Sequence, residues 1–132
     1  MIEVLRITLG YNSTYERVQI LNREEQTALG IPDLFEEAQI VLKDKSGTYI
    51  LPDYKIQAIQ YCRHCPPVRD LPMVKRIALM GDLLYQDCYI IPPELYGKYG
   101  IPQIFRGDEQ FVFCCKDGII IVPDYSINIV QV

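Results

Sequence analysis

The chain has 132 residues, 49% of them hydrophobic, and a formal net charge of −4. This composition is that of one globular domain, and it excludes a disordered or fibrous chain. The negative charge opposes non-specific attraction to nucleic acid or anionic lipid, and no stretch is long and apolar enough to predict a transmembrane helix or a signal peptide, so no membrane partner is expected.

The first elements predicted along the chain are a hairpin and a short helix. Residues 4–9 and 16–21 alternate between apolar and polar side chains, as paired strands do. Asn22 is then placed to cap a helix, because Glu25 follows three residues later and completes a capping box. Gly30 is followed by Ile-Pro, which predicts the end of that helix.

A second hairpin and one extra strand follow. Residues 39–43 and 49–51 read as strands joined by a tight turn that contains glycine. Residues 52–54, Pro-Asp-Tyr, interrupt the pattern, and residues 55–60 alternate again. The unit is therefore predicted to be two hairpins with a short helix between them and one added strand.

The same order of elements occurs twice. The halves align at an offset of seventy residues, which becomes seventy-one near Gly107, and roughly a third of the aligned positions are identical. Two copies are too few for a solenoid, so the sequence predicts a pseudo-dimer in one chain with one shared core. The first repeat is placed at 1–61, a linker containing prolines and cysteines at 62–71, and the second repeat at 72–132.

Part of the second repeat resembles a known family. The segment 89–101 contains Ile-Pro-Pro-Glu-Leu and ends in Gly-Ile, Gly107 and Asp108 precede an alternating strand, and residues 117–118 form an Asp-Gly turn. This series is similar to the AbrB/MazE/SpoVT-type swapped-hairpin domain. The resemblance implies a mainly β fold with short helices (β+α), a pseudo-two-fold barrel built from two tandem AbrB-like repeats whose hairpins interleave.

The same resemblance implies a function. Members of that family usually bind DNA as transcription factors or antitoxins, so we expect a small non-enzymatic cytoplasmic regulator that binds DNA and can form a homodimer. The bases that take the family's DNA-binding role are Arg6, Arg17, Arg23, Arg76 and Lys98. Because so few bases in an acidic chain predict weak binding, the alternative is an acidic protein-protein interaction module, an inhibitor or adaptor that keeps the barrel without DNA binding.

The tyrosines suggest where a protein partner would bind. The chain has ten tyrosines and no tryptophan, and tyrosine is enriched at interfaces. Four of them crowd the second repeat: Tyr85, Tyr89, Tyr96 and Tyr99. The first repeat has tyrosine at only one of the corresponding positions, which predicts a partner surface on the second repeat.

The cysteines suggest a metal site. Cys62 and Cys65 flank the only histidine in a C-x-x-C pattern, a candidate zinc half-site. Adjacent strand residues point to opposite faces, so at most one of Cys114 and Cys115 could complete it. The other interpretations are an unliganded pair, with no cofactor, and a redox role. Cys88 matches an apolar position and predicts a core filler. Five cysteines without a secretion signal predict free thiols in a reducing cytoplasm.

Signals for catalysis are missing. The sequence contains no glycine-rich phosphate loop and no nucleophile elbow. Asp53 and Asp124 recur in the two Pro-Asp-Tyr segments, where turn chemistry accounts for them. The sequence therefore predicts that the protein is not an enzyme.

Overall fold

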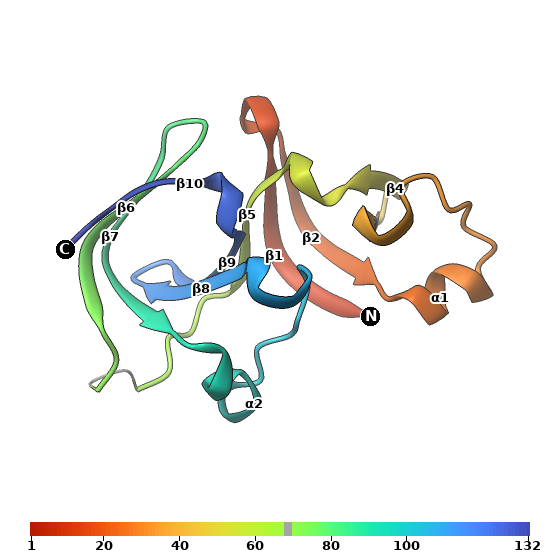
Figure 1. Ribbon diagram of the computed structural model, residues 1–132. Helices are drawn as coiled ribbons and strands as arrows, with labels where there is room; N and C mark the ends of the chain where they lie inside the picture. Colours follow the sequence, from red (N-terminus) through yellow and green to blue (C-terminus); the bar gives the residue numbers. More distant parts are fainter. Residues whose placement is uncertain (68–69) are drawn as a thin grey trace.

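The structure, a computed structural model, describes residues 1–67 and 70–132, so residues 68 and 69 of the predicted linker lie outside the described part. It confirms a mainly β fold with short helices (Figure 1). The first repeat forms β1 (Ile2–Leu9), β2 (Thr14–Leu21), β3 (Gln39–Asp44), β4 (Gly47–Pro52) and β5 (Ile56–Cys62). The second forms β6 (Met73–Leu79), β7 (Leu83–Ile91), β8 (Gln110–Cys115), β9 (Gly118–Pro123) and β10 (Ile127–Gln131).

All ten strands belong to one antiparallel sheet, in the order β10-β6-β7-β8-β9-β5-β1-β2-β3-β4. Both repeats have the same internal order, with the fifth strand beside the first. Among the described residues, β5 and β9 form the one strand pair between repeats. The repeats therefore lie side by side and do not interleave their hairpins, unlike the arrangement that the resemblance implies.

The ends of the sheet decide its symmetry. A two-fold axis between the repeats would pair β10 with β4 just as β5 pairs with β9, but β10 and β4 are the two outer strands of the described sheet (Figure 1). The sheet is open, and the expected pseudo-two-fold barrel is not confirmed. The physical reason is that the junction joins two different edges, which is a heterologous contact.

The helix signals in the first repeat are confirmed. The helix α1 (Arg23–Ala28) begins after Asn22, whose side-chain oxygen accepts a hydrogen bond from the N–H of Glu25 at 2.8 Å. The carboxylate of Glu25 accepts the N–H of Asn22 at 2.9 Å, so the capping box satisfies two backbone donors. Gly30 adopts a left-handed backbone with φ of 68°, a conformation that glycine adopts without steric cost.

The second repeat builds its helix differently. Pro93 begins a 3-10 turn, η4 (Pro93–Leu95), which continues into α2 (Tyr96–Tyr99). Gly100 ends it in the left-handed conformation, with its N–H donating to the carbonyl of Tyr96. Both repeats thus end their helix at a glycine and turn through Ile-Pro towards the third strand.

A buried glutamine holds that connection in each repeat. The side-chain oxygen of Gln110 accepts the N–H groups of Ile104 at 2.8 Å and Phe105 at 3.1 Å, and its amide donates to the carbonyl of Pro102 at 3.0 Å. Its counterpart Gln39 does the same for the loop of the first repeat. One side chain therefore supplies hydrogen-bond partners to backbone groups in this irregular segment that would otherwise have none.

The two repeats share a core. Ile59 of β5 and Ile121 of β9 lie opposite each other and are fully buried in a cluster that contains side chains of both repeats. Polar contacts also cross the junction: the hydroxyl of Ser126 donates to the carbonyl of Gln57 at 2.8 Å. Hydrophobic burial at this junction therefore joins the repeats into one body.

A buried carboxyl also lies close to the second repeat. Asp53 is 6% exposed in the 3-10 turn η3 (Asp53–Lys55), and burial raises its pKa because desolvation disfavours the charged form. The charge of Arg106 and the backbone N–H of Tyr54 act in the opposite direction. Arg106 in turn lies 3.3 Å from Glu37, an ion pair between the repeats.

Replacing Gln110 tests whether this buried glutamine stabilises the connection between the helix and the third strand. Gln110→Ala removes three hydrogen bonds and leaves part-buried and buried N–H groups unsatisfied, so we expect unfolding free energy to fall by about 2–3 kcal/mol. Chemical denaturation measures the loss. Gln86→Ala, on an exposed position of β7, is the matched control and should change stability by less than about 0.5 kcal/mol. Equal losses of unfolding free energy in the two variants would contradict this role of Gln110.

Replacing Asp53 tests the buried carboxyl. Its folded pKa is raised, so the folded state binds more protons than the unfolded state, and stability falls as the pH rises through this range. Asp53→Asn should therefore raise the melting temperature at neutral pH, with a smaller gain at a pH where the native carboxyl is protonated. Asp124→Asn, at the exposed counterpart, is the control. A lower melting temperature for Asp53→Asn at neutral pH would contradict the assignment.

Candidate functional site

A cavity of about 640 Å³ opens on the first repeat between the β1–β2 hairpin, the β3–β4 turn and the segment that follows β5. Apolar side chains such as Val4 and Val18 form part of its lining. The charged and aromatic residues that line it are Glu3, Arg17, Lys43, Asp44, Lys45, Tyr61, Arg63 and His64. We call this feature the basic cavity.

The sheet brings these residues together from distant parts of the sequence. In the pairing of β2 with β3, Gln19 lies opposite Lys43, so Arg17 and Lys45 come to the same end of the strand pair. Arg17 has a left-handed backbone with φ of 52°, unusual for a residue with a side chain. Arg63 and His64 belong to the segment directly after β5 and complete the lining of the cavity.

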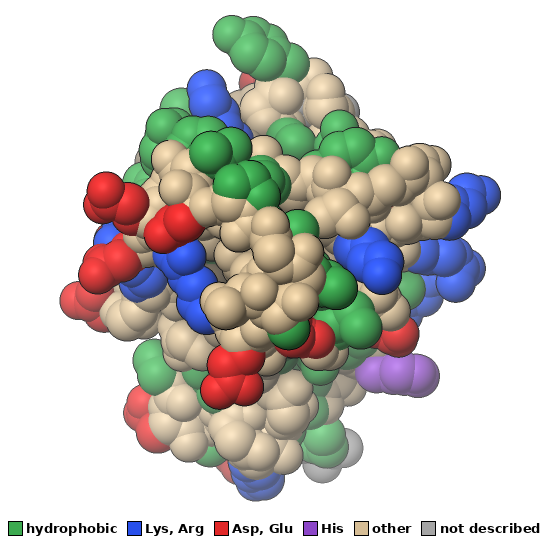
Figure 2. Space-filling model, turned by 90° about the vertical axis from the view of Figure 1, so that its right-hand side faces the viewer, with side chains coloured by type: hydrophobic (Ala, Val, Ile, Leu, Met, Phe, Trp, Pro, Cys, Tyr) green, Lys and Arg blue, Asp and Glu red, His purple; other side chains and the backbone are tan. Residues whose placement is uncertain are grey.

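The cavity carries an excess of positive charge. Arg17, Lys43, Lys45 and Arg63 are exposed, and none of them forms an ion pair within residues 1–67 and 70–132. In the view of Figure 2, several basic side chains lie along one edge of the molecule, above the chain's one histidine, and acidic side chains lie near them. The lining has these four cations and two carboxylates, Glu3 and Asp44, so it carries a net positive charge in a chain whose net charge is −4.

The two carboxylates of the cavity interact with neutral donors instead. Asp44 accepts the backbone N–H groups of Ser46 at 2.8 Å and Gly47 at 3.1 Å, which fixes the β3–β4 turn. Glu3 accepts the side-chain amide of Gln19 at 3.4 Å. Neither carboxylate therefore has its hydrogen bonds directed at a base, and the cations remain available to an anionic ligand.

The second repeat lacks this site. By the repeat alignment, Arg17 corresponds to Asp87 and Lys43 corresponds to Cys114. Asp87 has the same left-handed backbone, with φ of 53°, so the local fold is kept while the charge is reversed. At this position the repeats therefore differ in side-chain charge and not in backbone conformation.

Two of the five predicted DNA-binding residues already have acidic partners. The guanidinium of Arg6 lies 2.7 Å from the carboxylate of Glu16 on the paired strand, and that of Arg23 lies 3.4 Å from Asp33. Both pairs are exposed, so they hold the side chains only loosely in water. Arg6 also lines a second cavity, of about 410 Å³, between the repeats.

The other three lie on separate elements. Arg17 lines the basic cavity, Arg76 is exposed on β6, and the amine of Lys98 in α2 lies 5.5 Å from the ring centroid of Tyr99. The five predicted bases thus do not form one face. Lys43, Lys45 and Arg63, which sequence reasoning missed, complete the basic cavity; only the pairing of strand 16–21 with strand 39–43 could have indicated the two lysines.

The predicted partner-binding tyrosines contribute mainly to the interior. Tyr96 is buried at 8% exposure, and the hydroxyl of Tyr99 donates to the carbonyl of Pro67 at 3.2 Å. Tyr85 packs against Phe113 with ring centroids 5.2 Å apart. Burial raises the pKa of Tyr85 to about 12, and nearby Cys115 and Asp117 add to this effect.

Tyr89 is half-buried on β7, where it lies opposite Cys114. Of the four tyrosines, Tyr85 is the one that reaches the second cavity, which it lines with Arg6 and Arg63. The four side chains therefore serve the core, the linker and this cavity, and they do not together form an exposed patch.

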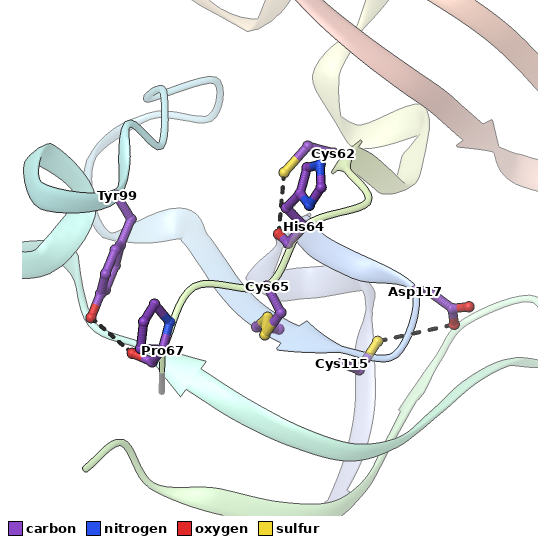
Figure 3. Close-up of a disulfide and its surroundings, with 8 residues drawn as sticks. Cys62, His64, Cys65, Pro67, Tyr99, Cys115 and Asp117 are labelled. Carbon is purple, nitrogen blue, oxygen red and sulfur yellow. Dashed lines mark hydrogen bonds between the residues drawn. A yellow bond between two sulfur atoms is a disulfide. The ribbon is translucent and has the colours of Figure 1, made fainter. Parts of the chain in front are cut away.

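The cysteines form a crosslink. Cys65 is joined to Cys114 of β8 in a disulfide with a Cα–Cα distance of 5.7 Å, which ties the linker to the second repeat (Figure 3). The prediction of five free thiols, on which the expected cytoplasmic location rested, is therefore wrong: Cys62, Cys88 and Cys115 are free. Sequence reasoning missed the pair because its partners are 49 residues apart.

The two cysteines of the predicted zinc half-site are in different bonding states, because the sulfur of Cys65 is held in the disulfide and Cys62 is free. The thiol of Cys62 donates to the carbonyl of His64 at 3.4 Å, away from the disulfide (Figure 3). Across the residues that the structure describes, no cluster of three or more potential metal ligands is found. Cys88 is fully buried, as predicted for a core filler, and its hydrogen bond with Cys115 together with burial raises the pKa of its thiol.

Comparison with protein-family models, with curated proteins and with solved structures finds no match to this chain. Within the described chain, the helices are too short or too polar to cross a membrane. The resemblance to AbrB-like domains stays a prediction.

The disulfide can be tested against the zinc hypothesis. It closes a loop of about fifty residues, so Cys65→Ser should lower the unfolding free energy by about 4 kcal/mol. Cys62→Ser is the matched control and should have little effect, whereas a shared zinc ion would make both substitutions and a chelator destabilising. Thiol titration of the unfolded protein should count three free thiols; five would contradict the crosslink.

Proposed function

We propose that the protein is a small non-enzymatic regulator that binds DNA through the basic cavity of its first repeat. The observation that carries this proposal is the set of four exposed cations, Arg17, Lys43, Lys45 and Arg63, which line one cavity without carboxylate partners among the described residues. Phosphate oxygens are the ligands that such groups bind most often in nucleic acids.

The acidic net charge does not prevent this binding. Charges are screened over about 10 Å at moderate salt, so a phosphate in the cavity responds to the local cations more than to distant carboxylates. Arg17 supplies a planar guanidinium that can pair with two phosphate oxygens, and the lysines act as point charges around it. The rest of the acidic surface reduces non-specific binding elsewhere.

The size of the cavity indicates how DNA would lie. About 640 Å³ is the volume of a site for a small ligand, too small for the width of a duplex. The cavity therefore takes a short stretch of one sugar-phosphate backbone, and half-buried Tyr61 offers an apolar contact to a sugar. Contacts of this kind position DNA without reading its sequence.

Binding rather than catalysis suits the groups present. The cations hold an anion, while Glu3 and Asp44 are engaged by amide donors and are poorly placed to act as bases. The proposal thus keeps the regulatory function expected from the resemblance and moves its contact surface to the basic cavity.

The experiment measures binding to random-sequence duplex DNA by fluorescence anisotropy at a series of salt concentrations. Four phosphate contacts predict a slope of about −3.6 in log affinity against log salt. Lys43→Ala and Arg63→Ala should each weaken binding and make the slope shallower by about 1. Both side chains are exposed, so stability should change little.

Arg23→Ala is the matched control, because Arg23 lies outside the cavity and is paired with Asp33. It should leave the slope unchanged. If Arg23→Ala reduces the slope as much as Lys43→Ala does, the cavity is not the contact surface. If the protein does not bind DNA even at low salt, the proposal fails and the acidic interaction module becomes the better hypothesis.

A further inference from the structure

The edges of the sheet carry an inference independent of DNA binding. In each repeat, the fourth strand (β4 or β9) forms one edge, which we call the fourth-strand edge. The fifth strand (β5 or β10) forms the other, the fifth-strand edge. The junction inside the chain pairs the fifth-strand edge of the first repeat with the fourth-strand edge of the second. The two repeats therefore show that these edges fit each other.

The edges left over are of the same two kinds. The outer strands of the described sheet are β4, a fourth-strand edge, and β10, a fifth-strand edge, at the two ends of the strand order. We propose that copies of this chain associate head to tail, with β10 of one chain pairing antiparallel with β4 of the next. This contact between two chains would have the same strand pairing as the junction between the two repeats inside one chain.

Burial supports this continuity. At the junction, Ala58 of β5 and Ile119 of β9 are 2% and 3% exposed. Their counterparts on the free edges are Ile129, which is 62% exposed, and Thr48, which is also exposed. On the free fifth-strand edge, the apolar side chain of Ile129 is therefore exposed to solvent, whereas the corresponding position at the internal junction is buried.

The free edges carry no more protection against pairing than the edges that pair inside the chain. Natural edge strands carry lysines, prolines or bulges that prevent another strand from adding. Neither β4 nor β10 contains a charged residue. The pairing of β10 with β6 has a register shift, but so does the pairing of β5 with β1, and β5 pairs with β9 nevertheless. Pro52 stands at the last position of β4, but its counterpart Pro123 stands at the end of β9, which pairs with β5 nevertheless.

Space for the neighbouring strand is kept as well. A side chain at Gly118 of β9 would collide with the backbone of Cys62, so the glycine allows the close approach of β5. Its counterpart Gly47 on β4 is also glycine, and within 4 Å a side chain there would meet only Tyr49. The fourth-strand edge of the first repeat is therefore clear at the position where the internal partner comes closest.

The register of the contact follows from the repeat. Ile59 lies opposite Ile121 at the junction, and the offset of seventy-one residues places Val130 opposite Ile50 between chains. Because the two edges are different, the contact is heterologous and adds copies in one direction, giving an open array or a closed ring.

The test uses one variant for each edge. Ile129→Lys places a charge on β10, and Thr48→Lys places one on β4, both at positions that association would bury and that are exposed in the single chain. We expect the unmodified protein to form oligomers whose mass rises with concentration in sedimentation velocity. Each variant alone should stay monomeric.

Mixing the two variants identifies the pairing. The Ile129→Lys chain keeps a free β4 and the Thr48→Lys chain keeps a free β10, so an equimolar mixture should form one-to-one dimers with twice the monomer mass. Leu84→Lys, at a 49% exposed position of β7 between β6 and β8, is the matched control and should associate like the unmodified protein. Circular dichroism verifies that all variants are folded.

Three results would overturn the inference: an unmodified protein that stays monomeric at the highest concentration reached, an edge variant that dimerises by itself, or a mixture that remains monomeric. The second would show that like edges pair with each other. None of these results depends on DNA, so failure here leaves the proposed function untouched.

Discussion

The pairing of β5 with β9 is the constraint on which the rest of the structure depends. It joins two edges of different kind, so it places the second repeat beside the first in one continuous sheet. Ile59 and Ile121 are fully buried there, and the larger core cluster contains side chains from both repeats. A sixty-residue repeat alone buries too little surface to be very stable, and this junction supplies the missing burial.

Within that common frame the repeats have diverged in chemistry. Lys43 in the first repeat adds a cation to a cavity, whereas Cys114 at the same position in the second is bonded to Cys65 of the linker. The linker thus closes against the second repeat, and its first residues, Arg63 and His64, line the cavity of the first. One short segment contributes to both differences.

The sequence predicted local structure well because local chemistry determines it. Asn22 and Glu25 satisfy each other's backbone groups wherever the helix lies in the fold. Gly30 can adopt the left-handed backbone conformation that ends the helix without help from distant residues. The mainly β fold and both hairpins of each repeat followed from alternation and turn residues in the same way.

Features that join distant residues were not predictable in the same way. Nothing near Cys65 in the chain indicates Cys114, and nothing near Arg17 indicates Lys43 or Arg63, because the register of the sheet decides which of them meet. The repeat itself suggested a two-fold pair, since identical sequences most often associate symmetrically. It could not show that unlike edges would pair instead.

Head-to-tail association and DNA binding, if combined, reinforce each other. A single chain offers four cations from its cavity, so the proposed binding to a polyanion would be of modest affinity and would weaken as salt rises. Copies joined edge to edge repeat the cavity at a fixed spacing, and each further contact then forms at a high effective concentration.

The coupling also acts in the other direction, because a ligand that binds the array more tightly than the monomer must favour association. An acidic chain with few bases would then bind DNA more tightly where several copies meet on it. Under these two proposals, weak binding by the isolated chain would be a means of control, since occupancy would depend on protein concentration more steeply than a single site allows.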